Sequence, residues 1–112
     1  MRAIDVFLMS NLAPSFTGLP FMVWIGQKGY QKHDCRVRVS MGPKVKPGDL
    51  VTITVRPEVR EIPSAGILPP EEMRALTRWI ELNRDVLVKF WEGDIEYTND
   101  VLEQLKPLEE AD

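Results

Sequence analysis

The spacing of apolar residues along the chain changes near residue 62. Before this point apolar side chains favour every second position, whereas from Pro69 onward they recur at every third or fourth position. A spacing of two is typical of strands, and a spacing of three and four is typical of helices. Because the predicted strands precede the helices and do not alternate with them, the pattern indicates an α+β fold.

The expected architecture is an antiparallel sheet of about four strands, packed by one long C-terminal helix and a short second helix. We expect a single domain over residues 1–112, with strands mainly in 1–62, helices in 68–106 and a tail in 107–112. Prolines and a glycine in residues 11–20 predict a loop, and the segment 27–32 around Gly29 predicts a turn. The predicted strands are residues 4–10, 21–26, 35–41 and 50–56.

The last two predicted strands form a hairpin whose register can be argued from the pattern. Each strand alternates apolar with polar residues, so inward residues must pair with inward ones. Placing Val39 opposite Val51 sets Asp34 across from Arg56. A shift by two residues would set Arg36 against Arg56, and like charges directly opposite are destabilising. We therefore expect the first register.

The helical half contains clear start and stop signals. Pro69 and Pro70 suit a helix start, and Gly93 suits a left-handed cap at its end. A second helix is predicted over residues 99–106, with Thr98 as its N-cap. We expect the long helix to lie across the apolar face of the sheet. Its expected apolar face consists of Met73, Leu76, Ile80, Leu87 and Phe90, widened by Trp79, Leu82, Val86 and Trp91.

Composition places the chain among ordinary globular proteins, with 44% hydrophobic and 28% charged residues. Its one cysteine, Cys35, cannot form an intrachain disulfide. No apolar run approaches the roughly 20 residues of a membrane-spanning helix. Residues 1–20 also lack the basic start and unbroken apolar stretch of a secretory signal. These features predict a cytoplasmic protein without a membrane partner.

The net charge of −3 conceals an uneven distribution. Residues 1–60 carry nine basic and four acidic side chains, which gives +5, and residues 61–112 carry five basic and thirteen acidic side chains, which gives −8. This asymmetry indicates one basic and one acidic surface. Either both surfaces serve only solubility, or the basic first half contacts an anionic partner.

The candidate binding residues lie on the polar face of the predicted hairpin and on its connection. We expect these basic side chains to face solvent as a stripe suited to phosphates or to an acidic protein surface. They are Arg36, Arg38 and Arg56 on the strands, with Lys44 and Lys46 on the stiff loop that joins them.

Candidate catalytic or metal chemistry is sparse. His33 and Cys35 would point the same way on one strand, but no second histidine or cysteine completes a tetrahedral site. Cys35 is either a buried small hydrophobe or half of a thiol–imidazole pair with His33. We expect no metal, no cofactor and no catalytic residues, which favours a protein that is not an enzyme.

Two helical features leave alternatives open. Trp79 and Trp91 fall about 120° apart on a helical wheel, so either both lie in the core or Trp91 is exposed as an interface anchor. Asn83, with Arg84 and Asp85, interrupts the apolar face of the long helix. These residues form the solvent side, or a buried Asn83 bonds the backbone of a neighbouring strand.

Several motifs of the helical half and one before the hairpin form a recognisable set. They are Leu68-Pro69, Glu72 to Leu76, Trp79-Ile80-Glu81-Leu82-Asn83-Arg84-Asp85, Leu87, Trp91, Leu105-Lys106-Pro107-Leu108 and, more loosely, Lys32-His33-Asp34-Cys35-Arg36-Val37. Together they resemble the four-one-six-zero domain-of-unknown-function family, whose usual run of several histidines is here a single one. The resemblance implies a bacterial α+β protein with a toxin–antitoxin-like role and assigns no reaction.

Two functions remain as hypotheses. The first is a non-enzymatic interaction module that binds a protein or another anionic partner, including a second copy of the chain. The second is a toxin–antitoxin-like component that acts on or binds nucleic acid through the same arginines. The charge asymmetry and the lack of a catalytic set favour the first.

Overall fold

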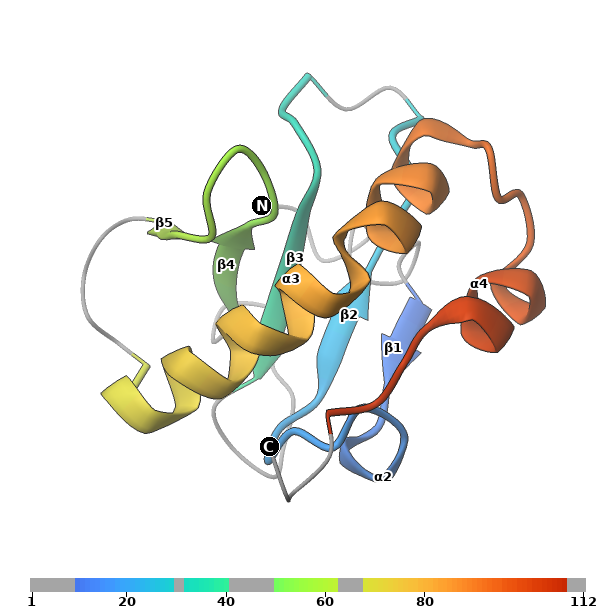
Figure 1. The fold of residues 1–112 in the computed structure, drawn as a ribbon. Coiled ribbons are helices and arrows are strands. Elements are labelled where there is room, and N and C mark those ends of the chain that lie inside the picture. Colours follow the sequence, from blue (N-terminus) through green and yellow to red (C-terminus); the bar gives the residue numbers. More distant parts are fainter. Residues whose placement is uncertain (1–9, 30–31, 41–49, 63–67, 109–112) are drawn as a thin grey trace.

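The computed structural model describes residues 10–29, 32–40, 50–62 and 68–108, in which five strands form one antiparallel sheet in the order β1-β2-β3-β4-β5 (Figure 1). The strands are β1 (Ser10–Leu12), β2 (Val23–Ile25), β3 (Arg36–Ser40), β4 (Leu50–Thr54) and β5 (Glu61–Ile62). The helices of this part of the chain are α2 (Pro14–Thr17), α3 (Pro70–Glu92) and α4 (Thr98–Gln104). The predicted α+β class, with a long helix followed by a short one, is confirmed.

The register of the central hairpin is the one expected from charge and alternation. Val39 of β3 lies opposite Val51 of β4. Just beyond the paired residues, Arg56 Nη2 contacts Asp34 Oδ1 at 2.9 Å. Alternation and cross-strand charge were sufficient here because a slip by one residue exposes the apolar set and a slip by two opposes two arginines.

Helix α3 crosses one face of the sheet, as predicted (Figure 1). It begins at Pro70 and ends before Gly93, whose φ of 88° gives the left-handed cap. None of the described helices is both long and apolar enough to cross a membrane. Leu82 is 47% exposed and does not widen the apolar face, because its direction on the wheel is opposite to the core side. The residues that α3 buries are Leu76, Trp79, Ile80, Asn83, Leu87, Phe90 and Trp91.

The segment 11–20 is not the single loop that its prolines predicted. Leu12 is buried in β1 opposite Val23, so tertiary burial extends the sheet into this segment. Pro14 begins α2, and Gly18 ends it with φ of 80°. The predicted first strand falls mostly on residues 1–9, which lie outside the described residues, and so does the basic loop around residue 45.

Asn83 is buried and connects α3 to the segment after α4. Its Nδ2 donates to the carbonyl of Lys106 at 2.9 Å and to that of Trp79 at 3.0 Å. Its Oδ1 accepts from the Lys106 amide at 2.7 Å. The alternative of a buried Asn83 that bonds neighbouring backbone is therefore confirmed, although that backbone belongs to no strand. Arg84 is half-buried and donates to the Val55 carbonyl at 2.9 Å.

The start of α4 differs from the prediction. Tyr97, and not Thr98, occupies the N-cap position, and no side chain caps the helix. The Thr98 hydroxyl instead lies 2.9 Å from that of Ser10, at the start of β1. Local capping preferences could not indicate this contact between residues distant in sequence.

Candidate interaction surface

The three arginines of the predicted basic stripe do not share one solvent-facing surface. Arg38 is only 8% exposed and lies opposite Trp24, which is 5% exposed. Arg36 is half-buried, and burial lowers its pKa. The Nε atom of Arg36 is buried without a hydrogen-bond partner in the described part of the chain. The prediction of a fully solvated stripe is therefore wrong for Arg38 and holds only in part for Arg36.

Arg56 is engaged in ion pairs within the molecule. Its Nε and Nη2 donate to both carboxylate oxygens of Asp34 at 2.9–3.1 Å, and its Nη2 also lies 3.4 Å from Glu92. These bonds hold the pKa of Asp34 below its usual value. The cluster links the residues flanking β3 and β4 to the end of α3, and such exposed pairs contribute about 0–1 kcal/mol each. Lys44 and Lys46, the other predicted binding residues, lie outside the described residues.

Trp91 belongs to the core and is not an exposed interface anchor. It is 4% exposed, and Trp79 is fully buried, so the alternative that placed both in the core is confirmed. The ring of His33 stacks on Trp91 with centroids 5.1 Å apart and planes at 27°. His33 Nδ1 lies 2.8 Å from the Asp34 carbonyl oxygen. Burial against Trp91 lowers the pKa of His33, because the charged form is poorly solvated there.

Cys35 is a core residue. It is 3% exposed, and its Sγ lies 3.8 Å from the Leu87 carbonyl oxygen. Burial raises the pKa of the thiol to about 12, so the thiolate required of a nucleophile is not available near neutral pH. Among the described residues, no three histidine, cysteine or acidic side chains are grouped as a metal site would require.

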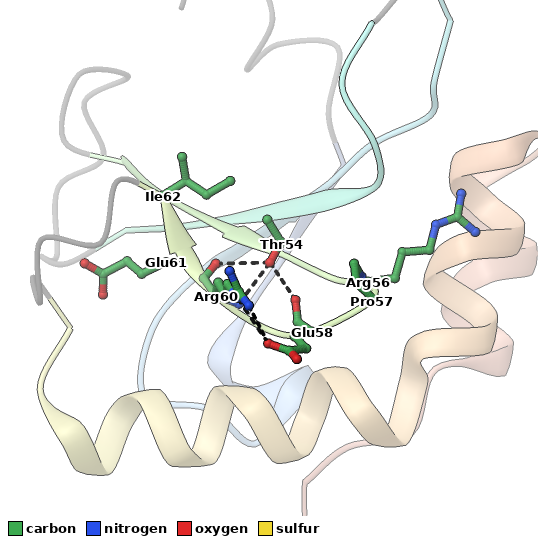
Figure 2. Close-up of a pocket in the computed structure, with 7 residues that line it drawn as sticks. All are labelled: Thr54, Arg56, Pro57, Glu58, Arg60, Glu61 and Ile62. Atoms are coloured by element: carbon green, nitrogen blue, oxygen red, sulfur yellow. Dashed lines mark hydrogen bonds and ion pairs between the residues drawn. The ribbon is translucent and has the colours of Figure 1, made fainter.

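A hollow of about 410 Å³ lies on the turn between β4 and β5 (Figure 2). The Thr54 hydroxyl donates to the Glu58 carbonyl at 2.7 Å and accepts from the Arg60 amide at 2.9 Å, which shapes the turn. Arg60 pairs with Glu58 at 2.8 Å. Arg56 points away from Arg60 in Figure 2. The two guanidinium groups therefore do not converge on one anion.

The connection between α3 and α4 presents an aromatic side chain to solvent. Tyr97 is 65% exposed, although its neighbours Ile95 and Val101 are buried. Its carbonyl accepts from the Val101 amide at 3.2 Å, and Gln27 Nε2 donates to the Glu96 carbonyl at 2.8 Å. The backbone on both sides of Tyr97 is thus anchored while the ring faces outward.

Exposed carboxylates precede and follow Tyr97 along the chain. We call this surface the acidic margin, defined as Tyr97 with Asp94, Glu96, Asp100 and Glu103, all of them exposed. Its residues belong to the connection between α3 and α4 and to α4 itself, and these two segments lie at one side of the molecule (Figure 1). None of these four carboxylates makes an ion pair within the described chain. The charge distribution of the sequence indicated an acidic half but did not single out Tyr97. The feature that could have indicated Tyr97 is an aromatic residue between acidic residues in a short connection between two helices.

Comparison with known proteins supplies no relative, because no family model, curated protein or solved structure matches the chain. The resemblance of the helical half to the four-one-six-zero family stays a prediction. The site must therefore be interpreted from its own chemistry.

Proposed function

We propose that this protein is a non-enzymatic interaction module that binds a basic protein surface through the acidic margin. The observation that carries the proposal is the exposed ring of Tyr97, whose backbone is anchored and which belongs to a segment, residues 94–103, with four exposed carboxylates. Tyrosine is enriched among the residues that dominate binding energy at protein interfaces. A segment whose backbone is already anchored also loses less conformational entropy on binding.

The carboxylates give the surface its choice of partner. Four exposed carboxylates in the same segment as Tyr97 attract a lysine- or arginine-rich surface and repel nucleic acid and acidic proteins. The chemistry first expected of the arginines, contact with an anionic partner, has less support. Arg38 is buried, and Arg56 is already paired with Asp34 and Glu92. This contrast favours a basic protein over a nucleic acid.

The proposal is tested by fluorescence anisotropy with two labelled probes, a lysine- and arginine-rich peptide and a single-stranded RNA. We expect the peptide to bind, and more weakly as salt rises, because exposed charges are screened. Replacing Tyr97 by serine changes no charge at neutral pH and removes the ring. If Tyr97 anchors the contact, Tyr97→Ser weakens peptide binding about tenfold.

Two double variants with the same change in net charge distinguish binding through the acidic margin from an effect of the negative charge of the whole protein. Asp100→Asn with Glu103→Gln removes two carboxylates from the margin, and Glu81→Gln with Asp85→Asn removes two exposed carboxylates from α3. Only the double variant of the acidic margin should bind the peptide more weakly and with a smaller dependence on salt. Binding of the RNA in preference to the peptide, or equal effects of the two pairs, contradicts the proposal.

A further inference from the structure

The backbone on both sides of Tyr97 is held by contacts with distant segments. Before it, Gln27 Nε2 donates to the Glu96 carbonyl at 2.8 Å, and after it the Thr98 hydroxyl lies 2.9 Å from the Ser10 hydroxyl. Tyr97 itself has extended backbone at the N-cap of α4, with φ of −106° and ψ of 145°. Its backbone position is therefore fixed, and the ring, which is 65% exposed, retains only the freedom of its two side-chain torsions.

Asp100 lies one helical turn beyond Tyr97. Its amide donates to the Tyr97 carbonyl at 3.1 Å. The side chains of an N-cap residue and of the third helical residue are neighbours, with Cβ atoms about 5–6 Å apart. Asp100 is exposed and makes no ion pair in the part of the chain that the structure describes. An exposed aromatic face and an exposed carboxylate are therefore presented together.

We propose that Tyr97 and Asp100 bind an arginine side chain of the partner in preference to a lysine side chain. The inference rests on the proposed function and names the residue of the basic partner that this surface selects. A guanidinium is planar, so it can stack flat on an aromatic ring and direct its N–H groups sideways to a carboxylate. The ring and the carboxylate then bind one and the same group.

Lysine is the weaker ligand for this pair of side chains. Its ammonium is a compact, strongly hydrated charge that binds a carboxylate as a point charge and not through a two-pronged contact. Contact with the ring face removes water from the cation, which is less costly for the weakly hydrated guanidinium. A partner with arginine should therefore bind about fivefold more tightly than a partner of equal charge with lysine.

The test compares two labelled peptides by fluorescence anisotropy with the full chain. They carry arginine or lysine at every basic position, are otherwise identical and contain no aromatic residue. We expect the arginine peptide to bind about fivefold more tightly. Tyr97→Phe keeps the aromatic face and should keep this ratio of dissociation constants. Tyr97→Leu keeps an apolar side chain without an aromatic face and should reduce the ratio to less than about twofold.

A second set of variants tests the carboxylate. Asp100→Asn removes the charge that the guanidinium contacts and should also reduce the ratio of the two dissociation constants. Asp85→Asn removes an equal charge from an exposed position of α3 and should leave the ratio unchanged. Tyr97, Asp100 and Asp85 are all exposed, and circular dichroism melting confirms that each variant is folded.

NMR of the complex with the arginine peptide observes the stacked contact directly. We expect nuclear Overhauser effects between the ring protons of Tyr97 and the δ-methylene protons of an arginine. The ring current should also shift these methylene protons upfield. The absence of both signals from a saturated complex overturns the inference.

The outcomes separate this inference from the proposed function. Equal binding of the two peptides, with both weakened by Tyr97→Ser, overturns the preference for arginine and leaves the proposed function standing. A preference that persists in Tyr97→Leu or in Asp100→Asn, or that Asp85→Asn also removes, overturns the inference as well. Failure of the wild-type chain to bind either peptide overturns both.

Discussion

Replacement of the buried Asn83 by alanine should destabilise the fold without a change in surface charge. Asn83 is 1% exposed, and its side chain makes two hydrogen bonds to the backbone of Lys106, at 2.7 and 2.9 Å. These bonds attach the segment after α4 to the middle of α3. Alanine removes both and leaves an N–H and a C=O of a half-buried segment without their partner.

The expected loss of stability follows from the hydrogen bonds and the side-chain volume that Asn83→Ala removes. A hydrogen bond contributes about 0.5–1.5 kcal/mol net, so two bonds to Lys106 amount to about 1–3 kcal/mol. The third bond, to the Trp79 carbonyl, adds little because the helix ladder also uses that oxygen. The lost side-chain volume leaves a small void, which costs roughly 1 kcal/mol more. We expect a loss of about 2–4 kcal/mol, equivalent to a melting temperature lower by roughly 10–20 °C.

Urea unfolding followed by tryptophan fluorescence measures this loss as a lower midpoint with an unchanged slope. Asn99→Ala, at an exposed position of α4, is the control and should stay within about 0.5 kcal/mol of the wild type. Amide hydrogen exchange gives an independent readout, since the Lys106 amide should lose protection in Asn83→Ala. If Asn83→Ala unfolds within about 0.5 kcal/mol of the wild type, the side chain does not hold the segment and the reasoning is wrong.

Three further outcomes test other parts of the structure. Gly18 and Gly93 both have a positive φ, so an alanine at either position costs about 1–2 kcal/mol of stability. In Gly18→Ala the new methyl group would also clash with the Leu108 carbonyl oxygen, so urea unfolding should show a larger loss of stability than in Gly93→Ala. Cys35, whose thiol has a pKa of about 12, should resist iodoacetamide at pH 8 in the native protein and react in urea; rapid native labelling contradicts its burial. An NMR titration of His33 should give a pKa below 6.5. The contribution of neutral His33 to the free energy of unfolding should be fully present above pH 6.5 and should decrease as the pH falls towards this lower pKa, and His33→Asn should remove that pH dependence.

The fold class was predictable because its signals are local and repeated. Alternation in β3 and β4 defined two strands and their register, and Pro70 and Gly93 marked the ends of α3. The segment 11–20 was not predictable, because its strand and helix exist only through contacts such as Leu12 with Val23. The local pattern of that segment is dominated by its prolines, which predict a loop and not a strand or a helix.

The candidate site was less accessible to sequence reasoning. Alternation placed Arg36 and Arg38 on the polar side of β3 but could not tell that Arg38 is buried there. Charge counting located the acidic half, yet the exposure of Tyr97 depends on which neighbours are buried. Polar residues can be assigned to a face from spacing, whereas their accessibility depends on the segments that cover that face.

The amino-acid sequence by itself determined the α+β class, the hairpin register, the limits of the long helix and the separation of basic from acidic residues, since each follows from the spacing of residue types and from turn and cap signals along the chain. Tertiary structure alone decided that Asn83 bonds Lys106, that Arg56 is held by Asp34 and Glu92, and that Tyr97 faces outward. These contacts join residues far apart in the chain, and their formation depends on how the helices pack on the sheet.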